Sequence, residues 1–121
     1  MNRAKAFVLW TGIFIFVVSA ATGAPSLADT RKDESSAATR GREVYTANCA
    51  RCHGADGMSH TSMGEMTEAP DLTDAAWQSR RSTARMIASV TNGRGEMPAF
   101  GRKLSKSQIA AAVAYVRSLK H

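Results

Sequence analysis

The stretch Cys49-Ala50-Arg51-Cys52-His53 contains both cysteines of the chain and one of its three histidines. If this segment is helical, residues three and four positions apart project from the same face, so both thiols and the imidazole lie together. The pattern Cys-x-x-Cys-His is typical of a c-type haem attachment site, where two thiols add to the haem vinyl groups and the histidine binds iron. We therefore expect one covalent haem c, with His53 as an axial iron ligand.

Three other chemistries use paired cysteines. A redox dithiol of the thioredoxin type needs a strand before the motif, and no strand pattern precedes Cys49. A structural zinc site needs four ligands, and the remaining histidines, His60 and His121, lack zinc-finger spacing. A plain disulfide in an oxidising compartment stays open, but it would leave His53 without a role.

The first 28 residues have the pattern of an export signal. Arg3 and Lys5 supply a positive start, residues 6–22 are uncharged and mostly apolar, and residues 26–28 (Ser-Leu-Ala) fit the small-x-small rule of signal peptidase. We expect cleavage after residue 28 and export to the periplasm. The alternative is an uncleaved anchor that holds the domain on the periplasmic side, although an apolar run this short is marginal for a membrane span.

Charge and composition narrow the function classes. The formal net charge is +6, and removal of residues 1–28 with their two basic side chains lowers it to +4. The arginines are scattered, aromatic residues are few and no nucleic-acid motif appears, which argues against nucleic-acid binding. Residues 29–38 carry no large apolar side chain, so we expect a disordered leader there and one folded domain over residues 39–121.

Helical periodicity dominates the folded domain, and no strand-like alternation of useful length appears. The first expected helix covers residues 39–49, where Gly41, Tyr45 and Cys49 recur every four positions along one stripe. A glycine inside a helix costs about 1 kcal/mol relative to alanine. Gly41 therefore marks either the close approach of another helix or a frayed first turn.

Two further helices are expected, separated by long loops. Ser82 or Thr83 opens the second helix, and Gly93 ends it. A capping box at Ser105 opens the third and clearest helix, which runs to Leu119. The loops are residues 58–77, expected to wrap the haem through Met58, Met63, Met66 and Leu72 and to hold a short turn capped by Thr73, and residues 93–96, expected to be a flexible link.

Haem iron has a second axial position, opposite His53. The candidates for it are Met58, His60, Met63, Met66, Met86, Met97 and His121. Met58 and His60 are too close to His53 in sequence to reach the opposite face of the ring. Met86 lies on an apolar helix face, which is typical of a core residue. We favour Met97, which lies 44 residues after His53 in a Gly-rich loop stiffened by proline, and leave Met63 and Met66 open. Two strong axial ligands favour electron transfer over catalysis.

Several segments together resemble the small bacterial class I cytochromes c. They are Gly41-x-x-x-Tyr45-x-x-x-Cys49-x-x-Cys52-His53-Gly54, Ala69-Pro70-Asp71-Leu72, Val90-Thr91-Asn92-Gly93-x-x-x-Met97-Pro98-x-Phe100 and Ala114-Tyr115-Val116. The resemblance covers about residues 39–120 and implies the all-α class I cytochrome c fold, with three main helices and long loops around one covalent haem.

The resemblance also implies roles for individual residues. The N- and C-terminal helices should cross, with Gly41 and Tyr45 meeting Tyr115. The Pro70 carbonyl should accept a hydrogen bond from the His53 ring nitrogen that faces away from iron, which fixes the ring and raises its basicity. Two further expectations place Trp77 near a haem propionate and Asn92 near the Met97 loop.

These features favour an exported, non-enzymatic one-electron carrier between periplasmic or membrane redox partners. The alternative is a haem-c electron-transfer subunit of an oxidase or dehydrogenase complex. An enzyme or sensor in which Met97 leaves the iron, and a haem-free dithiol oxidoreductase, are the remaining hypotheses. Redox proteins that dock through an acidic surface of their own are the expected partners. Membrane contact is expected only if the N-terminal segment is retained. The basic residues expected near the haem edge are Arg51, Arg94, Arg102 and Lys103.

Overall fold

The computed structural model describes residues 27–121, and in this range the chain is all-α, as predicted. The helices are α1 (Leu27–Asn48), α2 (Ala50–His53), α3 (Ser62–Met66), α4 (Ala75–Ser79), α5 (Thr83–Asn92) and α6 (Lys106–Ser118). Extended pairing within these residues is limited to one isolated bridge between Arg94 and Met97. The predicted signal peptide lies almost entirely outside the described residues, so its cleavage stays a prediction.

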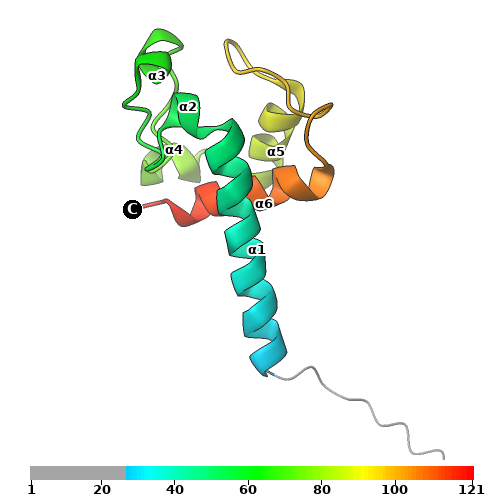
Figure 1. Ribbon diagram of the computed structural model, residues 1–121. Coiled ribbons are helices and arrows are strands. Elements are labelled where there is room, and N and C mark those ends of the chain that lie inside the picture. Colours follow the sequence, from blue (N-terminus) through cyan, green and yellow to red (C-terminus); the bar gives the residue numbers. More distant parts are fainter. Residues whose placement is uncertain (1–26) are drawn as a thin grey trace, which may run out of the picture.

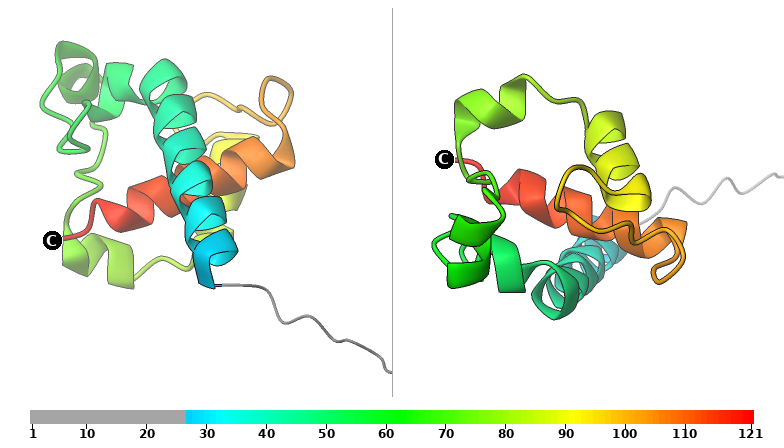
Figure 2. Two further views of the ribbon diagram at one scale, coloured as in Figure 1. Left: turned by 60° about the horizontal axis from the view of Figure 1, so that its bottom comes forward. Right: turned by 90° about the horizontal axis from the view of Figure 1, so that it is seen from above.

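The centre of the fold is the crossing of α1 over α6, which the two views of Figure 2 show from different sides. Gly41 lies at this crossing, and a Cβ atom there would collide with the Ala111 carbonyl of α6. One turn further along α1, Tyr45 is 0% exposed, and its ring centroid lies 5.2 Å from that of Tyr115. Gly41 is therefore a packing glycine, and the frayed-turn alternative is wrong.

The N-terminal half of α1 differs from the prediction. Residues 29–38, expected to be a disordered leader, are helical, and residues 31–40 are all exposed. Figure 1 shows this part of α1 projecting away from the other helices. Once the packed turns around Gly41 have formed, each added residue fixes one more hydrogen bond, and Ala, Arg, Lys and Glu extend a helix at little cost. The composition argument considered only buried surface and so missed a helix that buries almost none.

The later helices begin and end near the predicted positions. The Ser82 side chain caps α5 by accepting a hydrogen bond from the Arg85 N–H. At α6 the predicted capping box is present, with Ser105 and Gln108 satisfying each other's main-chain N–H groups. The side chains that α6 buries in the core are Ile109, Ala112 and Val113.

The segment predicted as a long loop contains two single-turn helices. The Thr61 hydroxyl accepts a hydrogen bond from the Gly64 N–H at the start of α3. The Asp74 carboxylate accepts hydrogen bonds from the Ala76 and Trp77 N–H groups of α4, so Asp74, and not Thr73, is the cap. Both helices depend on these local caps, because neither is long enough to be stable through its own hydrogen bonds.

Gln78 ties α4 to the rest of the molecule. Its side chain is 1% exposed, and its Nε2 donates hydrogen bonds of 2.8 Å to the carbonyls of Leu72 and Val116. The Arg117 guanidinium of α6 donates to the Gln78 carbonyl at 2.9 Å and also reaches the Arg81 carbonyl. This network holds α4 and the start of α5 against α6, and so positions one wall of the site described next.

Candidate haem site

The cysteine motif lies where α1 passes into α2. Cys49 interrupts the helix, yet its N–H donates to the Tyr45 carbonyl at 2.8 Å and the His53 N–H donates to the Cys49 carbonyl at 3.0 Å. Helical hydrogen bonding therefore continues through the break and keeps Cys49, Cys52 and His53 on one side, as the spacing predicted. Both cysteines are free thiols and partly buried, and His53 is 8% exposed.

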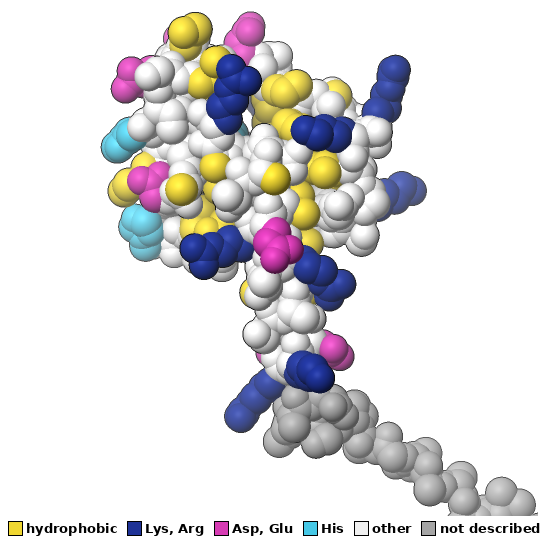
Figure 3. Space-filling view, in the orientation of Figure 1, with side chains coloured by type: hydrophobic (Ala, Val, Ile, Leu, Met, Phe, Trp, Pro, Cys, Tyr) yellow, Lys and Arg dark blue, Asp and Glu magenta, His cyan; other side chains and the backbone are white. Residues whose placement is uncertain are grey.

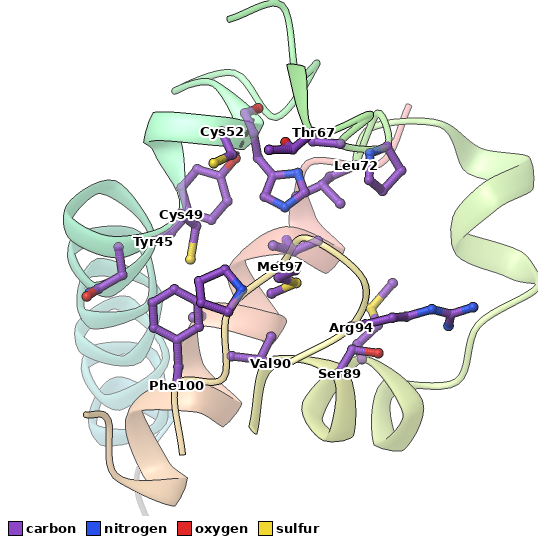
Figure 4. Close-up of a pocket in the computed structure, with 18 of the residues that line it drawn as sticks. Tyr45, Cys49, Cys52, Thr67, Leu72, Ser89, Val90, Arg94, Met97 and Phe100 are labelled. Atoms are coloured by element: carbon purple, nitrogen blue, oxygen red, sulfur yellow. Dashed lines mark hydrogen bonds between the residues drawn. The ribbon is translucent and has the colours of Figure 1, made fainter. Parts of the chain in front are cut away.

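These three side chains and Met97 line one cavity of about 670 Å³, a size typical of cofactor sites. Figure 4 shows the Cys49 sulfur and the Met97 side chain pointing into the same space from two parts of the chain. Most of the wall is apolar, with contributions from Tyr45, Leu72, Met86, Val90, Pro98 and Phe100. Figure 3 shows hydrophobic side chains exposed in the upper part of the molecule, between separate Lys and Arg side chains.

The chemistry of this lining fits a haem c. Two free thiols can form thioethers, an imidazole and a thioether can bind iron, and the remaining wall suits an apolar ring. In the described part of the chain every buried side-chain nitrogen or oxygen already has a hydrogen-bond partner. The cavity therefore offers ligands to a metalloporphyrin rather than polar groups to a hydrophilic ligand.

The Met97 loop is a tight hairpin and not the flexible link that was predicted. The Arg94 N–H donates to the Met97 carbonyl and the Met97 N–H donates to the Arg94 carbonyl, each at 3.0 Å. Gly93 and Gly95 provide positive φ angles of 77° and 56° at the turn. The Phe100 N–H then donates to the Val90 carbonyl of α5 at 2.9 Å. Met97 is thus held by main-chain bonds on both sides.

The other methionines separate into two groups. Met63 and Met86 also line the cavity, whereas Met66 is 75% exposed and Met58 is not part of the wall. The expectation that Met58 and Met66 contact the haem is therefore wrong for this structure. Met66 is the last residue of α3 and faces solvent, because the Thr61 cap turns the other side of that short helix toward Cys52. Met97 and Met63 remain as candidate ligands in the wall.

Two polar groups lie behind the His53 ring. Nδ1 lies 3.3 Å from the Ser59 hydroxyl, and that hydroxyl donates a hydrogen bond of 2.6 Å to the Pro70 carbonyl. Burial lowers the pKa of His53, and the Pro70 carbonyl opposes this shift without overcoming it. The neutral imidazole is the form that binds a metal.

The Cys49 thiol does not have the electrostatics of the attacking thiol in a redox dithiol. Burial, and to a smaller extent the neighbouring Cys52, raise the pKa of Cys49 to about 11. A catalytic dithiol needs a pKa below that of a free thiol, so that the attacking thiolate is populated. The zinc alternative also lacks support, because no group of three or more His, Cys, Asp or Glu side chains suited to a metal occurs among residues 27–121.

The rim of the cavity carries basic side chains. Arg51 and Arg94 lie on the rim, as expected near a haem edge, whereas the exposed Arg102 and Lys103 are not part of the lining. Trp77 lines the cavity as expected and carries the Arg81 guanidinium 4.3 Å above its ring. Asn92 is exposed and directly precedes the Met97 loop.

Two side chains at the site were missed in the sequence. Arg81 lies two residues beyond the end of α4, so helical spacing gave no signal for its stacking on Trp77. Ser59 lies in a loop with no periodic pattern, so no signal in the sequence pointed to it.

Comparison with known proteins agrees with this geometry. A family model described as "Cytochrome C oxidase, cbb3-type, subunit III" matches residues 36–116. The cbb3-type cytochrome c oxidase subunit FixP of Azorhizobium caulinodans is 38% identical over 78% of this chain and 31% of its own length. Subunit CcoP of Rhodobacter capsulatus is 37% identical over 68% of this chain and 29% of its own length. The chain thus spans about a third of the length of these curated relatives.

A solved structure, titled "KustC0563 c-type cytochrome", has the same fold. It superposes with a TM-score of 0.64 at 35% identity, covering 67% of this chain and 98% of its own. In the described residues, no helix is both long and apolar enough to cross a membrane. The family match covers well over half of the chain and includes the cysteine motif and the Met97 loop. The chain therefore belongs to the cytochrome c family of cbb3-type oxidase subunit III, and its fold is that of a small class I cytochrome c.

Proposed function

We propose that this chain is a haem-c electron-transfer subunit, or part of one, in a respiratory oxidase complex. The observation that carries the proposal is that two free thiols, an imidazole and a thioether line a single apolar cavity. The relatives named as subunits of cbb3-type oxidases support the oxidase assignment. We assign one haem c to the chain, because it contains one pair of cysteines. The folded unit is assigned to residues 39–121, on the periplasmic side of the membrane.

Each site residue has a defined role in this proposal. When bound, haem c supplies an iron couple that takes up and releases one electron. Cys49 and Cys52 would hold the ring covalently, each thiol adding its S–H across one vinyl group. His53, through Nε2, and Met97, through its thioether, would hold the iron, and the apolar wall would exclude water. A thioether raises the reduction potential relative to a second imidazole.

The basic rim is the proposed docking surface for an acidic face of a redox partner. Arg80, Arg81, Arg85 and Arg94 gather around a smaller hollow that shares Arg81 and Arg94 with the main cavity. Positive charge beside the cavity would steer an acidic partner toward the edge of the haem. This rim differs from the predicted one, because Arg102 and Lys103 are not part of the cavity lining. Their place is taken by Arg80 and Arg81, which follow α4, and by Arg85 of α5.

A freely diffusing carrier is the second candidate, supported by a different observation. The KustC0563 cytochrome is matched over nearly its whole length, so this domain corresponds to a complete cytochrome in that case. Native gel electrophoresis of gently solubilised host membranes, stained for haem, distinguishes the two functions. A subunit migrates with a large oxidase complex, whereas a carrier is recovered at low mass in the soluble fraction.

The axial ligation is tested by replacing Met97. The oxidised protein, matured in a host that attaches haem c, should show the weak red absorption band of a sulfur–iron bond. Met97→Ala should abolish this band and lower the reduction potential, because the thioether is lost. Met63→Ala is the matched control, since Met63 also lines the cavity and is expected to leave the band intact. Persistence of the band in Met97→Ala, or its loss in Met63→Ala, would contradict the assignment.

A further inference from the structure

Ser59 is an unusual residue for its position. It is 6% exposed, and its φ of 63° lies in the left-handed region that favours glycine. A non-glycine residue in this region costs roughly 1 kcal/mol or more. The conformation is held by main-chain bonds, with the Ser59 N–H donating to the His53 carbonyl at 2.9 Å and the Thr61 N–H donating to the Ser59 carbonyl at 2.9 Å. Glycine would serve the backbone better, so any benefit of serine must come from its hydroxyl.

The hydroxyl lies between His53 and Pro70, and the direction of its hydrogen bonds is fixed. The Pro70 carbonyl can only accept, so the Ser59 hydroxyl must donate its single proton to it, at 2.6 Å. The Ser59 oxygen is then free only to accept from His53 Nδ1, 3.3 Å away. Nδ1 must therefore carry the ring proton, which leaves the lone pair on Nε2, the nitrogen available to a metal.

The turn that carries Ser59 is itself fixed to the haem motif. The Tyr45 hydroxyl donates to the Gly54 carbonyl at 2.7 Å, and the Leu72 N–H donates to the Gly57 carbonyl at 2.8 Å. The first bond joins the turn to α1 and the second joins it to the segment that follows Pro70. Both neighbours of the Ser59 hydroxyl are thus held in place, and the three groups form a chain of two hydrogen bonds.

We propose that Ser59 is a positioning residue whose hydroxyl relays a hydrogen bond from His53 Nδ1 to the Pro70 carbonyl. This assignment rests on the proposed function of His53 as an axial ligand. The sequence led us to expect a direct bond from His53 to the Pro70 carbonyl; that carbonyl does act on the His53 ring, and the Ser59 hydroxyl bonds to both groups. Because a hydroxyl that donates to a carbonyl becomes a better acceptor, the relay draws the Nδ1 proton outward and increases electron donation from the imidazole. Stronger donation favours the oxidised iron, so the relay lowers the reduction potential.

The test compares three variants of the matured holoprotein. Ser59→Ala removes the hydroxyl and keeps the Cβ atom, and Ser59→Gly removes both the hydroxyl and the unfavourable φ. Ser79→Ala is the control, because Ser79 is exposed on α4 and its hydroxyl bonds only within that helix. The readouts are the reduction potential and, in the reduced protein, the NMR shift and deuterium exchange rate of the His53 Nδ1 proton.

Both Ser59 variants should show a higher potential, an upfield shift of the Nδ1 proton and about tenfold faster exchange, because one hydrogen bond is lost. Ser79→Ala should match the wild type. Wild-type values in Ser59→Ala would overturn the relay, since the Pro70 carbonyl would then accept from His53 directly. Potentials that differ between the Ala and Gly variants would also overturn it, because backbone strain and not the hydroxyl would be responsible. A wild-type protein without covalent haem would instead refute the proposed function.

Discussion

Gly41 and Tyr45 lie one turn apart on α1, and both face α6. The absence of a side chain at Gly41 lets the α1 backbone approach the Ala111 carbonyl, and the Tyr45 ring fills the space beside Tyr115. The Tyr45 hydroxyl then donates to the Gly54 carbonyl at 2.7 Å, directly after the haem motif. The same pair of residues thus sets the helix crossing and anchors the segment that carries His53.

Replacing Gly41 by alanine tests the crossing. The added methyl group would collide with the Ala111 carbonyl, so α1 must move away from α6. We expect a loss of about 1–2 kcal/mol in the free energy of unfolding, even though alanine gains about 1 kcal/mol in helix propensity. Denaturant unfolding of the holoprotein measures this, with Thr46→Ala on the exposed side of α1 as the control. A Gly41→Ala protein as stable as the control would show that the helices are not in close contact.

At the scale of single residues, the sequence predicted the positions of side chains that belong to a short motif. Cys49, Cys52 and His53 follow from their spacing, and the Tyr45–Tyr115 contact followed from the family resemblance and is confirmed. Ser59 could not be predicted, because its position depends on a turn whose φ angles do not show in the residue types. The role of a buried hydroxyl becomes visible only when its neighbours are placed in three dimensions.

Among the elements, the helices with apolar periodicity were predicted, whereas of the short helices only a turn near α4 was expected, with Thr73 in place of Asp74 as its cap. The helices α5 and α6 begin at the expected capping residues, since both caps and apolar faces were readable. The short helices α3 and α4 have no apolar stripe, and each depends on one side-chain cap and on tertiary contacts. Residues 93–96 were predicted to be flexible because they contain two glycines. In the structure, those glycines allow the tight hairpin that holds Met97.

Replacing Gln78 tests how α4 is held against α6. Gln78→Ala removes the amide that donates to the buried carbonyls of Leu72 and Val116, leaving both without that partner. We expect a loss of about 1–3 kcal/mol in the free energy of unfolding, because the Leu72 carbonyl would be left buried without this partner, whereas the Val116 carbonyl still accepts from the Leu119 N–H.

Ser79→Ala is the neighbouring exposed control for this measurement, and a change within about 0.5 kcal/mol is expected there. Urea unfolding followed by circular dichroism gives both values. Equal stability of the two variants would mean that the contacts of Gln78 do not hold α4 against α6.

At the scale of the whole molecule, the helices and loops surround a cavity of about 670 Å³ in a small domain. A cavity with an apolar wall is costly unless something fills it, because its lining lacks packing contacts. The sequence predicted this arrangement indirectly, since the long segment between the first helix and α5 lacked the pattern of a self-contained core. The identity of the wall, and the inclusion of Met86 and Arg81 in it, required the fold.

The attachment of the ring to both thiols is the central claim, and mass spectrometry of the protein matured in its host tests it most directly. We expect an intact mass increased by one haem, carried by the peptide with Cys49 and Cys52, and neither thiol available to an alkylating reagent. A chain of unmodified mass in which both cysteines are alkylated would contradict the account.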